Sequence, residues 1–530
     1  MKKQLLLLVS MLILPILMFA QEESIGIDER INQAFKPISD FFFNLVFFAI
    51  GDVPFVLILL VVSAMIFTVY FGFVNIRKFG TAVNVVRGKY DEIEKHEGAF
   101  AEAAIDGDIP DTIRDENADG EVTHFQALAT AVSGTVGNGN IAGVALAIAL
   151  GGPGATFWMI ICGLLGMSTK FVECTLGVKY RDIGPDGTVY GGPMYYLSKG
   201  LKEKGFEAVG KVAAVLFAIF CIGGSFGGGN AAQSNQATIV LKDLLGLESA
   251  GAGAIIGLVL AVLVGIIIIG GIKRIASVTE KVVPLMAVMY VLACIYIIAI
   301  NYSLIDDAFM AIFTEAFSPK AAGVGGMIGV LLVGFKRAAF SNEAGAGSAS
   351  IAHSAVKTNY PASEGLVALL EPFIDTVVIC TMTALVIIIF NANGAFTYGG
   401  DGSGAVLIDG VYYEGAGITS QAFAKYIPYS NVFLTVAVVL FAVSTMISWS
   451  YYGIQSWKYL FGRSQVADII YKLIFCLFII IGAAANMSSI WAFSDAMIFA
   501  MVFPNMIGLF ILIPSVKKEL TRYLAAIKGA

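Results

Sequence analysis

Charged residues, cysteine and histidine are scarce in this sequence. Only 14% of the 530 residues are charged, whereas 58% are hydrophobic. A chain so long and so apolar cannot be a soluble globule, and a single membrane span would not account for its length. Because runs of about 20 apolar residues match the thickness of a bilayer core, the composition predicts an all-α polytopic membrane protein rather than a barrel. The formal net charge of −6 carries little information about partners.

The few cysteines and histidines limit the chemistry. All six cysteines lie in apolar stretches, where a small core residue is the ordinary role, and we expect no disulfide. No nucleophile with a neighbouring base and no metal-ligating cluster occurs in any apolar stretch. The sequence therefore argues against an enzyme, and we expect neither a cofactor nor a nucleic-acid partner.

The N-terminus has the pattern of a signal peptide. Lys2 and Lys3 precede a short apolar run, and Ala20 stands immediately before QEES. We expect residues 1–20 to be a removable signal peptide and 21–51 to be an extracytoplasmic segment. The alternative is an uncleaved anchor, for which the apolar run is short.

Apolar runs beyond this point predict eleven membrane spans. Lys and Arg gather in alternate loops, which favours a mature N-terminus outside the cell and a cytoplasmic C-terminus in the inner membrane. Residues 75–125, acidic over 91–124, then form a cytoplasmic loop, and 515–530 form a cytoplasmic tail. The expected spans are 52–74, 126–150, 155–177, 209–229, 250–271, 282–302, 322–350, 364–391, 431–453, 466–484 and 489–514.

The second of these spans contains residues that disfavour a helix. Its centre reads SGTVGNGN over 133–140. A broken helix within a bilayer is tolerated only where protein, water or a ligand satisfies the freed backbone groups. Its amide groups suit a carboxylate and its carbonyls suit a cation such as Na⁺. Close helix packing by small residues is the alternative, but it does not explain Thr135, Asn138 and Asn140. The match to a dinucleotide-binding G-x-G-x-x-A motif is rejected, because that motif needs a preceding strand.

Several long motifs carry a family resemblance. They are GEVTHFQALATAVSGTVGNGNIAGVA, GGPGATFWMI, GGPMYYL, FKRAAFSNEAGAGSA and STMISWSYYG, in that order along nearly the whole chain after residue 40. Together they resemble the alanine or glycine:cation symporter family. The resemblance implies Na⁺-coupled uptake of a small neutral amino acid. It also implies the leucine-transporter fold, with five-helix repeats at 126–302 and 303–514 after one extra span at 52–74.

The resemblance also implies positions for the bound species. Backbone amides around Gly137 and Gly139 would bind the substrate carboxylate. Thr135 and Asn140 fall where that fold places oxygen ligands of one Na⁺. A second Na⁺ site would take the carbonyls of Ser133 and Val136 and the hydroxyls of the eighth core span, for which the candidates are Ser444, Thr445 and Ser448. An all-oxygen ligand set suits a hard cation.

Two charged positions within spans need an explanation. Asp375 is a functional candidate because an unpaired buried charge is costly, and we expect it to be a ligand or charge partner of Na⁺. The alternative is a carboxylate satisfied by a neighbouring helix or by water. Lys170 and Glu173 are spaced i, i+3 and are expected to form a local ion pair.

The sixth core span should also be broken, near GFKRAAFSNEAGAG over 334–347. Phe335 and Trp449 are candidate walls of the substrate pocket, with ordinary packing as the alternative. Gln233 and Asn235 are candidates for lining an outer vestibule. In the outer loop 392–430, GAVLIDGVYY predicts a hairpin that turns at Asp409 and Gly410.

One motif in the acidic loop is weak. DENADGEV resembles the start of a calcium-binding EF-hand loop, but Gln126 stands where that loop needs a glutamate, so a solvated acidic loop is favoured. The functional expectation is alternating-access symport of Na⁺ with alanine or glycine. Proton coupling through Asp375, or a Na⁺-dependent amino-acid channel or sensor, are the alternatives.

Overall fold

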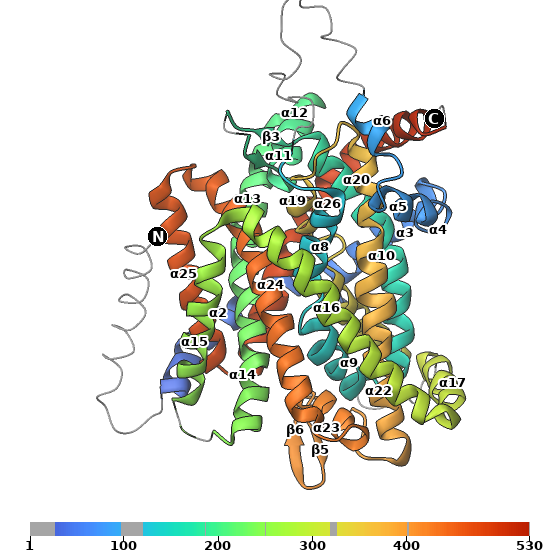
Figure 1. The fold of residues 1–530 in the computed structure, drawn as a ribbon, viewed down its shortest axis with the longest axis vertical. Coiled ribbons are helices and arrows are strands. Elements are labelled where there is room, and N and C mark those ends of the chain that lie inside the picture. The colour runs from blue at the N-terminus through green and yellow to red at the C-terminus, as the bar shows by residue number, and fades with distance from the viewer. Residues whose placement is uncertain are drawn as a thin grey trace, which may run out of the picture.

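The computed structural model describes residues 27–96, 120–185, 187–247, 249, 251–317, 326–399 and 402–528. The expected signal peptide at 1–20, most of the acidic loop and the start of the EF-hand-like motif lie outside these residues. The described chain is a bundle of long helices (Figure 1). The strands within it form three short antiparallel pairs, which are β1 (Ala49–Ile50) with β2 (Val53–Pro54), β3 (Asp182–Ile183) with β4 (Val189–Tyr190), and β5 (Val406–Ile408) with β6 (Val411–Tyr413).

Within the described residues, seven helical segments are long and apolar enough to cross a membrane. A bent pair, α8 (His124–Thr135) with η1 and α9 (Gly139–Gly151), makes an eighth. The seven segments are α10 (Gly154–Lys179), α13 to α14 (Glu207–Leu245), α16 (Gly271–Ile300), α20 to η6 (Pro361–Asn393), α24 (Ser430–Phe461), α25 (Gln465–Ala484) and α26 (Met487–Ala526).

The three other expected spans are shorter helices. They are α3 (Phe55–Tyr70), α15 (Ala252–Ile268) and α18 (Gly326–Asn342), with 16, 17 and 17 residues. Each predicted span therefore coincides with helix, whereas the number of eleven and the inverted repeat stay predictions. The remaining helices outside the composite segments are α2 (Ile27–Val46), α4 (Val74–Arg77), α5 (Phe79–Val86), α6 (Asp91–His96), α11 (Pro193–Tyr195), η2 (Tyr196–Gly200), α12 (Leu201–Glu203), η4 (Tyr302–Leu304), α17 (Ile305–Ala316), α19 (Ala349–His353) and α23 (Ala416–Tyr426).

Three of the long segments are composites. The middle of Glu207–Leu245 is a wider helical turn, η3 (Gly227–Ala231), between α13 (Glu207–Phe226) and α14 (Ala232–Leu245). The break between α8 and α9 is followed by a similar turn, η1 (Gly139–Gly143), before α9 (Val144–Gly151). Pro361–Asn393 consists of α20 (Pro361–Ala368), α21 (Leu370–Pro372), η5 (Phe373–Cys380), α22 (Thr381–Phe390) and η6 (Asn391–Asn393).

The outer surface of the bundle is apolar. On α16, Leu285, Val288 and Leu292 are each 57 to 59% exposed. Large exposed side chains at i, i+3 and i+7 form a stripe on one helix face that water would not favour. The stripe is the surface expected for contact with lipid.

Two helices are broken in the middle of the bundle. The first break separates α8 from α9, which lie one above the other in Figure 1 and are bent by 50°. The second follows α18, which ends at Asn342, before α19 begins at Ala349. Glu343, Gly345 and Gly347 have φ of 54°, 97° and 87° across this second gap. Such positive φ values end a helix and favour glycine. Both breaks begin within the stretches in which the sequence predicts them, 133–140 and 334–347.

The predicted hairpin is confirmed. Strands β5 and β6 pair with Ile408 opposite Val411, and the turn residues Asp409 and Gly410 have φ of 50° and 84°. Two consecutive positive φ values are the signature of a two-residue hairpin turn. The hairpin lies beside α23, at the end of the bundle opposite α12 and the C-terminus (Figure 1).

The segment before the first span is helical. Helix α2 lies along α26, where Ser39 Oγ donates to the Ser489 carbonyl at 2.7 Å and the Phe35 and Phe493 rings are 5.1 Å apart. The sequence analysis expected this stretch to lie outside the cell and predicted no structure for it.

Candidate functional site

Side chains from other elements satisfy the backbone of the first break. The Gly137 amide donates to Asn140 Oδ1 at 2.9 Å, and the Asn138 amide donates to Gln233 Oε1 at 2.9 Å. A Cβ added at Gly137 would overlap the Thr445 hydroxyl and lie 3.0 Å from Gln233 Oε1. Glycine is therefore needed at 137 for close approach of α24 and α14. The result is a pair of buried amides that side-chain oxygens hold in fixed directions within the protein interior.

Asp375 lies at the same level, on η5. Its carboxylate is fully buried and accepts hydrogen bonds from Asn140 Nδ2 at 2.6 Å, from Ser341 Oγ at 2.9 Å and from Thr376 Oγ1 at 2.7 Å. These donors come from η1, α18 and η5, so the carboxylate joins the two broken helices. Among the described residues, no Lys, Arg or His forms an ion pair with Asp375. The hydrogen bonds to the carboxylate thus come from neutral donors, and the Cys380 thiol contacts two of these donors, Asn140 and Ser341.

The expected approach of α24 to the first break is present. Thr445 Oγ1 donates to the Ser133 carbonyl at 3.0 Å, and Ser133 Oγ donates to the Ser444 carbonyl at 2.8 Å. One turn further on, the Ser448 hydroxyl is buried and has no hydrogen-bond partner among the described residues. A buried hydroxyl without a partner is uncommon in native proteins and calls for a ligand or another explanation.

Trp449 connects the two breaks. Its Nε1 lies 3.2 Å from the Gly134 carbonyl and 3.0 Å from Glu343 Oε1. Glu343 is buried on the unwound segment after α18, and its other oxygen accepts a short hydrogen bond from Ser348. Trp449 was predicted as a pocket wall, and Glu343 lies within the sequence predicted for the second break.

Two predicted residues have other contacts. The Thr135 hydroxyl donates weakly within its own helix, to the carbonyls of Ala131 and Val132 at 3.3 and 3.4 Å. The Phe335 ring packs 6.1 Å from the Trp158 ring, and Phe335 lines a small cavity with Leu57 and Leu60 of α3. Neither contact is with the Asp375 carboxylate or the amides of the first break.

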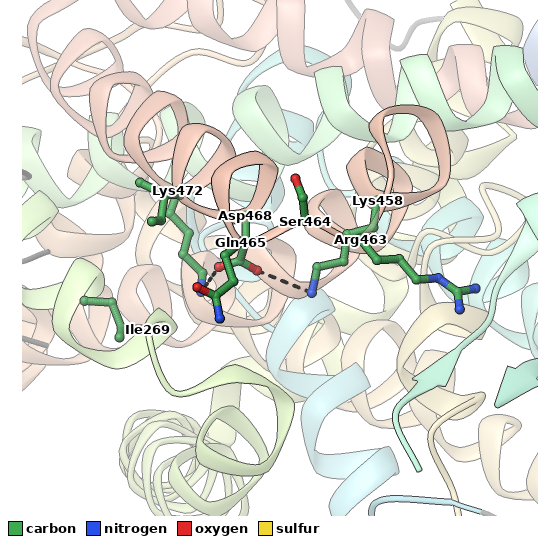
Figure 2. Close-up of a pocket in the computed structure, with 8 residues that line it drawn as sticks. Ile269, Lys458, Arg463, Ser464, Gln465, Asp468 and Lys472 are labelled. Atoms are coloured by element: carbon green, nitrogen blue, oxygen red, sulfur yellow. Dashed lines mark ion pairs between the residues drawn. The ribbon is translucent and has the colours of Figure 1, made fainter. Parts of the chain in front are cut away.

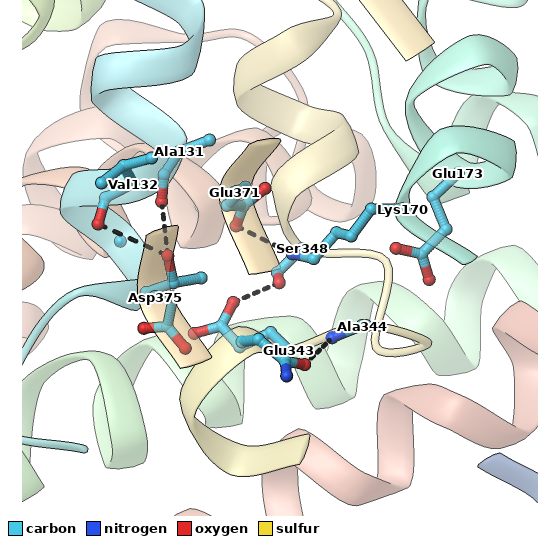
Figure 3. Close-up of polar contacts among 12 residues, drawn as sticks. Ala131, Val132, Lys170, Glu173, Glu343, Ala344, Ser348, Glu371 and Asp375 are labelled. Atoms are coloured by element: carbon cyan, nitrogen blue, oxygen red, sulfur yellow. Dashed lines mark hydrogen bonds and ion pairs between the residues drawn. The ribbon is translucent and has the colours of Figure 1, made fainter. Parts of the chain in front are cut away.

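The expected local pair of Lys170 with Glu173 is wrong. Lys170 Nζ lies 2.9 Å from Glu371 Oε1 on α21, and both side chains are fully buried (Figure 3). Glu173 instead accepts a hydrogen bond from Asn505 Nδ2 of α26 at 2.7 Å. The partners of both residues are distant in sequence, and i, i+3 spacing gives no information about such partners.

Residues missed by the sequence analysis complete the site. Ser341 and Thr376 hold Asp375. Gln233, named from the sequence as a candidate for an outer vestibule, contacts the first break, and its role in a vestibule stays a prediction. A usable signal existed for Thr376, which follows Asp375 directly, and for Ser341, which lies within the predicted second break. No sequence signal pointed to the contact of Gln233 with Asn138.

The cavity in Figure 2 is separate from these groups. It lies between α24 and α25, where Lys458 and Lys472 pair with Asp468 at 3.3 and 2.6 Å. Its lining contains none of the predicted site residues. We assign it no role in binding the transported species.

A family model described as the sodium:alanine symporter family matches residues 38–530. This chain belongs to that family. It is a multi-pass membrane protein that acts as a cation-coupled amino-acid symporter, and it is not an enzyme.

The symporter is also similar in sequence to named transporters. It is 38% identical to the sodium/alanine symporter AgcS of Methanococcus maripaludis over 87% of this chain and 92% of that one. It is 36% identical to the putative sodium/proton-dependent alanine carrier protein YrbD of Bacillus subtilis, over 76% and 81% of the two chains. A solved manganese transporter of Eremococcus coleocola shares 12% identity at a TM-score of 0.46, covering 75% of this chain and 78% of that one.

Proposed function

We propose that the symporter carries a small neutral amino acid, alanine or glycine, into the cell together with Na⁺ by alternating access. Both species bind at the two helix breaks. The end of the bundle with α6, α12 and the C-terminus faces the cytoplasm, because the loops predicted there are rich in Lys and Arg.

The uncompensated charge of Asp375 carries this proposal. A buried carboxylate without a basic partner needs a cation or a proton to offset its desolvation. Asn140, Ser341 and Thr376 each place an oxygen atom in the same polar cluster, and a set of oxygen ligands is what a hard cation requires. For Asn140 the amide must turn, because its nitrogen now donates to Asp375. Na⁺ bound here would link α18 to the first break and order both.

A second Na⁺ site is proposed between the first break and α24. The carbonyls of Ser133 and Val136 and the hydroxyls of Ser444, Thr445 and Ser448 are its ligands. The buried Ser448 hydroxyl without a partner supports this assignment. Thr445 already contacts the Ser133 carbonyl, so the two halves of the site are within reach of one small ion.

The amino acid binds beside the ion. Its carboxylate accepts hydrogen bonds from amides at Gly137 and Gly139, close to the positive end of the helix that follows the break. The Gly137 amide, which donates to Asn140 Oδ1 in the structure, is released when the Asn140 side chain turns towards Na⁺. Its ammonium meets carbonyls of the unwound segment after α18. Trp449 limits the space between the breaks, which favours a small side chain. One methylene changes binding by only about 1 to 3 kcal/mol, so overlap among glycine, alanine and serine is expected.

The coupling follows from shared structure. Na⁺ and substrate both order the broken segments, so their joint occupancy favours closure on the outer side and opening on the inner side. The membrane potential adds about 2.3 kcal/mol per charge per 100 mV to the driving force.

Uptake of labelled alanine into proteoliposomes tests the proposal. An inward Na⁺ gradient should give concentrative uptake that disappears when choline replaces Na⁺ at fixed pH. Equal uptake in both salts would reject Na⁺ coupling, and entry without accumulation would indicate a channel or sensor.

Proton coupling through Asp375 is the second candidate function. The same uncompensated carboxylate favours it, because a proton would also neutralise the buried charge. An inward proton gradient in choline medium distinguishes the two: concentrative uptake under those conditions would support the proton, and its absence would support Na⁺.

A further inference from the structure

A chain of buried titratable side chains forms no hydrogen bond or ion pair with the proposed ion ligands among the described residues, although its member Glu371 lies one helical turn before Asp375. Glu364 of α20 accepts hydrogen bonds from two imidazoles, from His124 Nδ1 in a short contact and from His353 Nδ1 at 2.5 Å. On its other side, His353 Nε2 lies 3.7 Å from Glu371 Oε2, and Glu371 Oε1 contacts Lys170. His124 is 8% exposed, and the other four residues are fully buried. The chain therefore leads from the edge of the protein to the middle of α10.

This chain connects the inner halves of the two broken helices. His124 is the first residue of α8, and His353 is the last residue of α19. Backbone pairing supports the same contact, because the Lys357 amide donates to the Val122 carbonyl at 2.8 Å and the Glu121 amide donates to the Ala355 carbonyl at 2.7 Å. In the proposed transport cycle, opening towards the α12 end separates α8 from α19. Glu364 binds His124 of α8 and His353 of α19, so this separation breaks at least one of its two contacts.

The contact between His353 Nε2 and Glu371 Oε2 has no proton to form a hydrogen bond while His353 is neutral. With Nδ1 donating to Glu364, a neutral His353 has a lone pair on Nε2, and this faces the Glu371 oxygen. Neither Nε2 nor Glu371 Oε2 has a hydrogen-bond partner among the described residues. Two buried acceptors that face each other repel, whereas a proton on Nε2 converts the contact into a charge-assisted hydrogen bond. That proton also adds a positive charge between the carboxylates of Glu364 and Glu371, beside the pair that Glu371 forms with Lys170.

The groups around His353 leave this assignment intact. Glu173 is bound to Asn505, Glu343 is bound to Trp449 and Ser348, and Arg181 donates to backbone carbonyls just after α19. The titratable or charged groups that face the pair from the neighbouring elements are His124 of α8, Lys170, Glu173 and Cys174 of α10, Arg181 after α10, Glu343 after α18, Glu364 of α20, Asp375 of η5 and Tyr452 of α24.

We propose that His353 and Glu371 bind one proton, and that this proton holds α19 against α20 and α21 and so keeps the inner side closed. The proton exchanges with water on the α12 side, because His353 is the last residue of α19, in the inner half of the second broken helix. Because it enters and leaves on one side, it regulates opening and is not a second coupling ion. This regulatory step rests on the proposed function, whereas the binding of the proton does not.

Nitrogen NMR of ¹⁵N-histidine-labelled protein in lipid tests the proton site without a substrate. The chain contains only three histidines, so His353→Gln assigns the signals of His353 and His96→Gln serves as a control outside the cluster. Between about pH 5.5 and 10, a range that spans ordinary imidazole titration, Nε2 of His353 should lose its proton while Nδ1 keeps its own. In Glu371→Gln the midpoint of this transition should move to lower pH. A single protonation state of Nε2 across the range, or an unmoved midpoint in Glu371→Gln, would overturn the proposal.

Alanine uptake at varied internal pH and fixed external pH tests the closure of the inner side. Wild-type uptake should slow as the internal pH falls, and His353→Gln should lose this dependence. Glu280→Gln is the matched control. Glu280 binds Gln126 in the first turn of α8 at 2.9 Å but is not one of the linked residues His124, Glu364, His353, Glu371 and Lys170. A wild-type pH profile in His353→Gln would overturn the regulatory role. If alanine is not transported at all, the proposed function fails, and the NMR titration still decides whether the proton site exists.

Discussion

Replacement of Lys170 by Met should destabilise the protein strongly, because it leaves the Glu371 carboxylate buried without its ammonium partner. Both side chains are fully buried and the pair is 2.9 Å long. Removal of one member of a buried pair costs about 3 to 5 kcal/mol, whereas replacement of both members is often nearly neutral. Lys170→Met should therefore lower the unfolding temperature by roughly 3 to 5 °C, and Lys170→Met with Glu371→Gln should recover most of the loss.

The neighbouring imidazole gives this prediction a pH dependence. His353 Nε2 is the other basic group facing Glu371, at 3.7 Å, and it offsets the carboxylate only while it carries a proton. The loss in Lys170→Met should therefore be smallest in acid and should grow as the pH rises. Thermal unfolding of purified protein, followed at several pH values, measures this.

The control is Lys472→Met. Lys472 pairs with Asp468 on the same helix, the two side chains are 15% and 25% exposed, and Asp468 keeps Lys458 as a partner. Such a partly exposed pair is worth well under about 1 kcal/mol. The reasoning is refuted if Lys170→Met is no more destabilising than this control, or if the double variant is as unstable as the single one.

Three further predictions concern the breaks and the surface. Gly137→Ala should raise the Na⁺ concentration for half-maximal uptake by about 5- to 150-fold, because overpacking costs roughly 1 to 3 kcal/mol. Gly139→Ala should change this concentration by less than about threefold, because the new Cβ would lie 3.5 Å from its nearest neighbour, Ser341. A large effect of both substitutions would reject the steric argument. Ser448→Ala should raise the same concentration about tenfold, whereas Ser450→Ala, whose hydroxyl donates to the Ile447 carbonyl at 2.6 Å, should not, and equal effects would remove Ser448 from the ion site. The hydrogen bond from Arg463 holds the pKa of Asp182 below its ordinary value of 3.8. The ionised Asp182 therefore stabilises the fold above pH 3.8, and this stabilisation is lost as the pH falls through the lowered pKa. The difference in unfolding temperature between wild type and Asp182→Asn should narrow over this acidic range, and a constant difference would contradict the assignment.

Features that depend on local sequence could be predicted. Both helix breaks, the hairpin turn at Asp409 and Gly410, and a helical segment at each expected span follow from glycine placement and apolar runs. The contact of Asn140 with Asp375 also agrees with the predicted ion site. The family membership, which the sequence motifs indicated, is confirmed by the family model.

Features that depend on tertiary contacts could not be predicted in the same way. Lys170 and Glu371 are 201 positions apart, and i, i+3 spacing suggested Glu173 instead. Gln233 was placed at a vestibule because its contact with Asn138 depends on how α14 packs against the first break. The histidines at 124 and 353 carry no motif, and only the fold brings both onto Glu364.

Simultaneous influx of ²²Na⁺ and labelled alanine, in wild-type proteoliposomes and in Asp375→Asn, tests the central claim most directly. Among the residues that the structure describes, the Asp375 carboxylate has no basic partner, and a unit charge about 4 Å from a cation contributes about 4 kcal/mol at an effective dielectric constant of 20. The account predicts alanine-dependent Na⁺ entry in the wild type and its loss in Asp375→Asn at Na⁺ concentrations that saturate the wild type. Alanine entry without Na⁺ entry, or unchanged coupled entry in the variant, would contradict it.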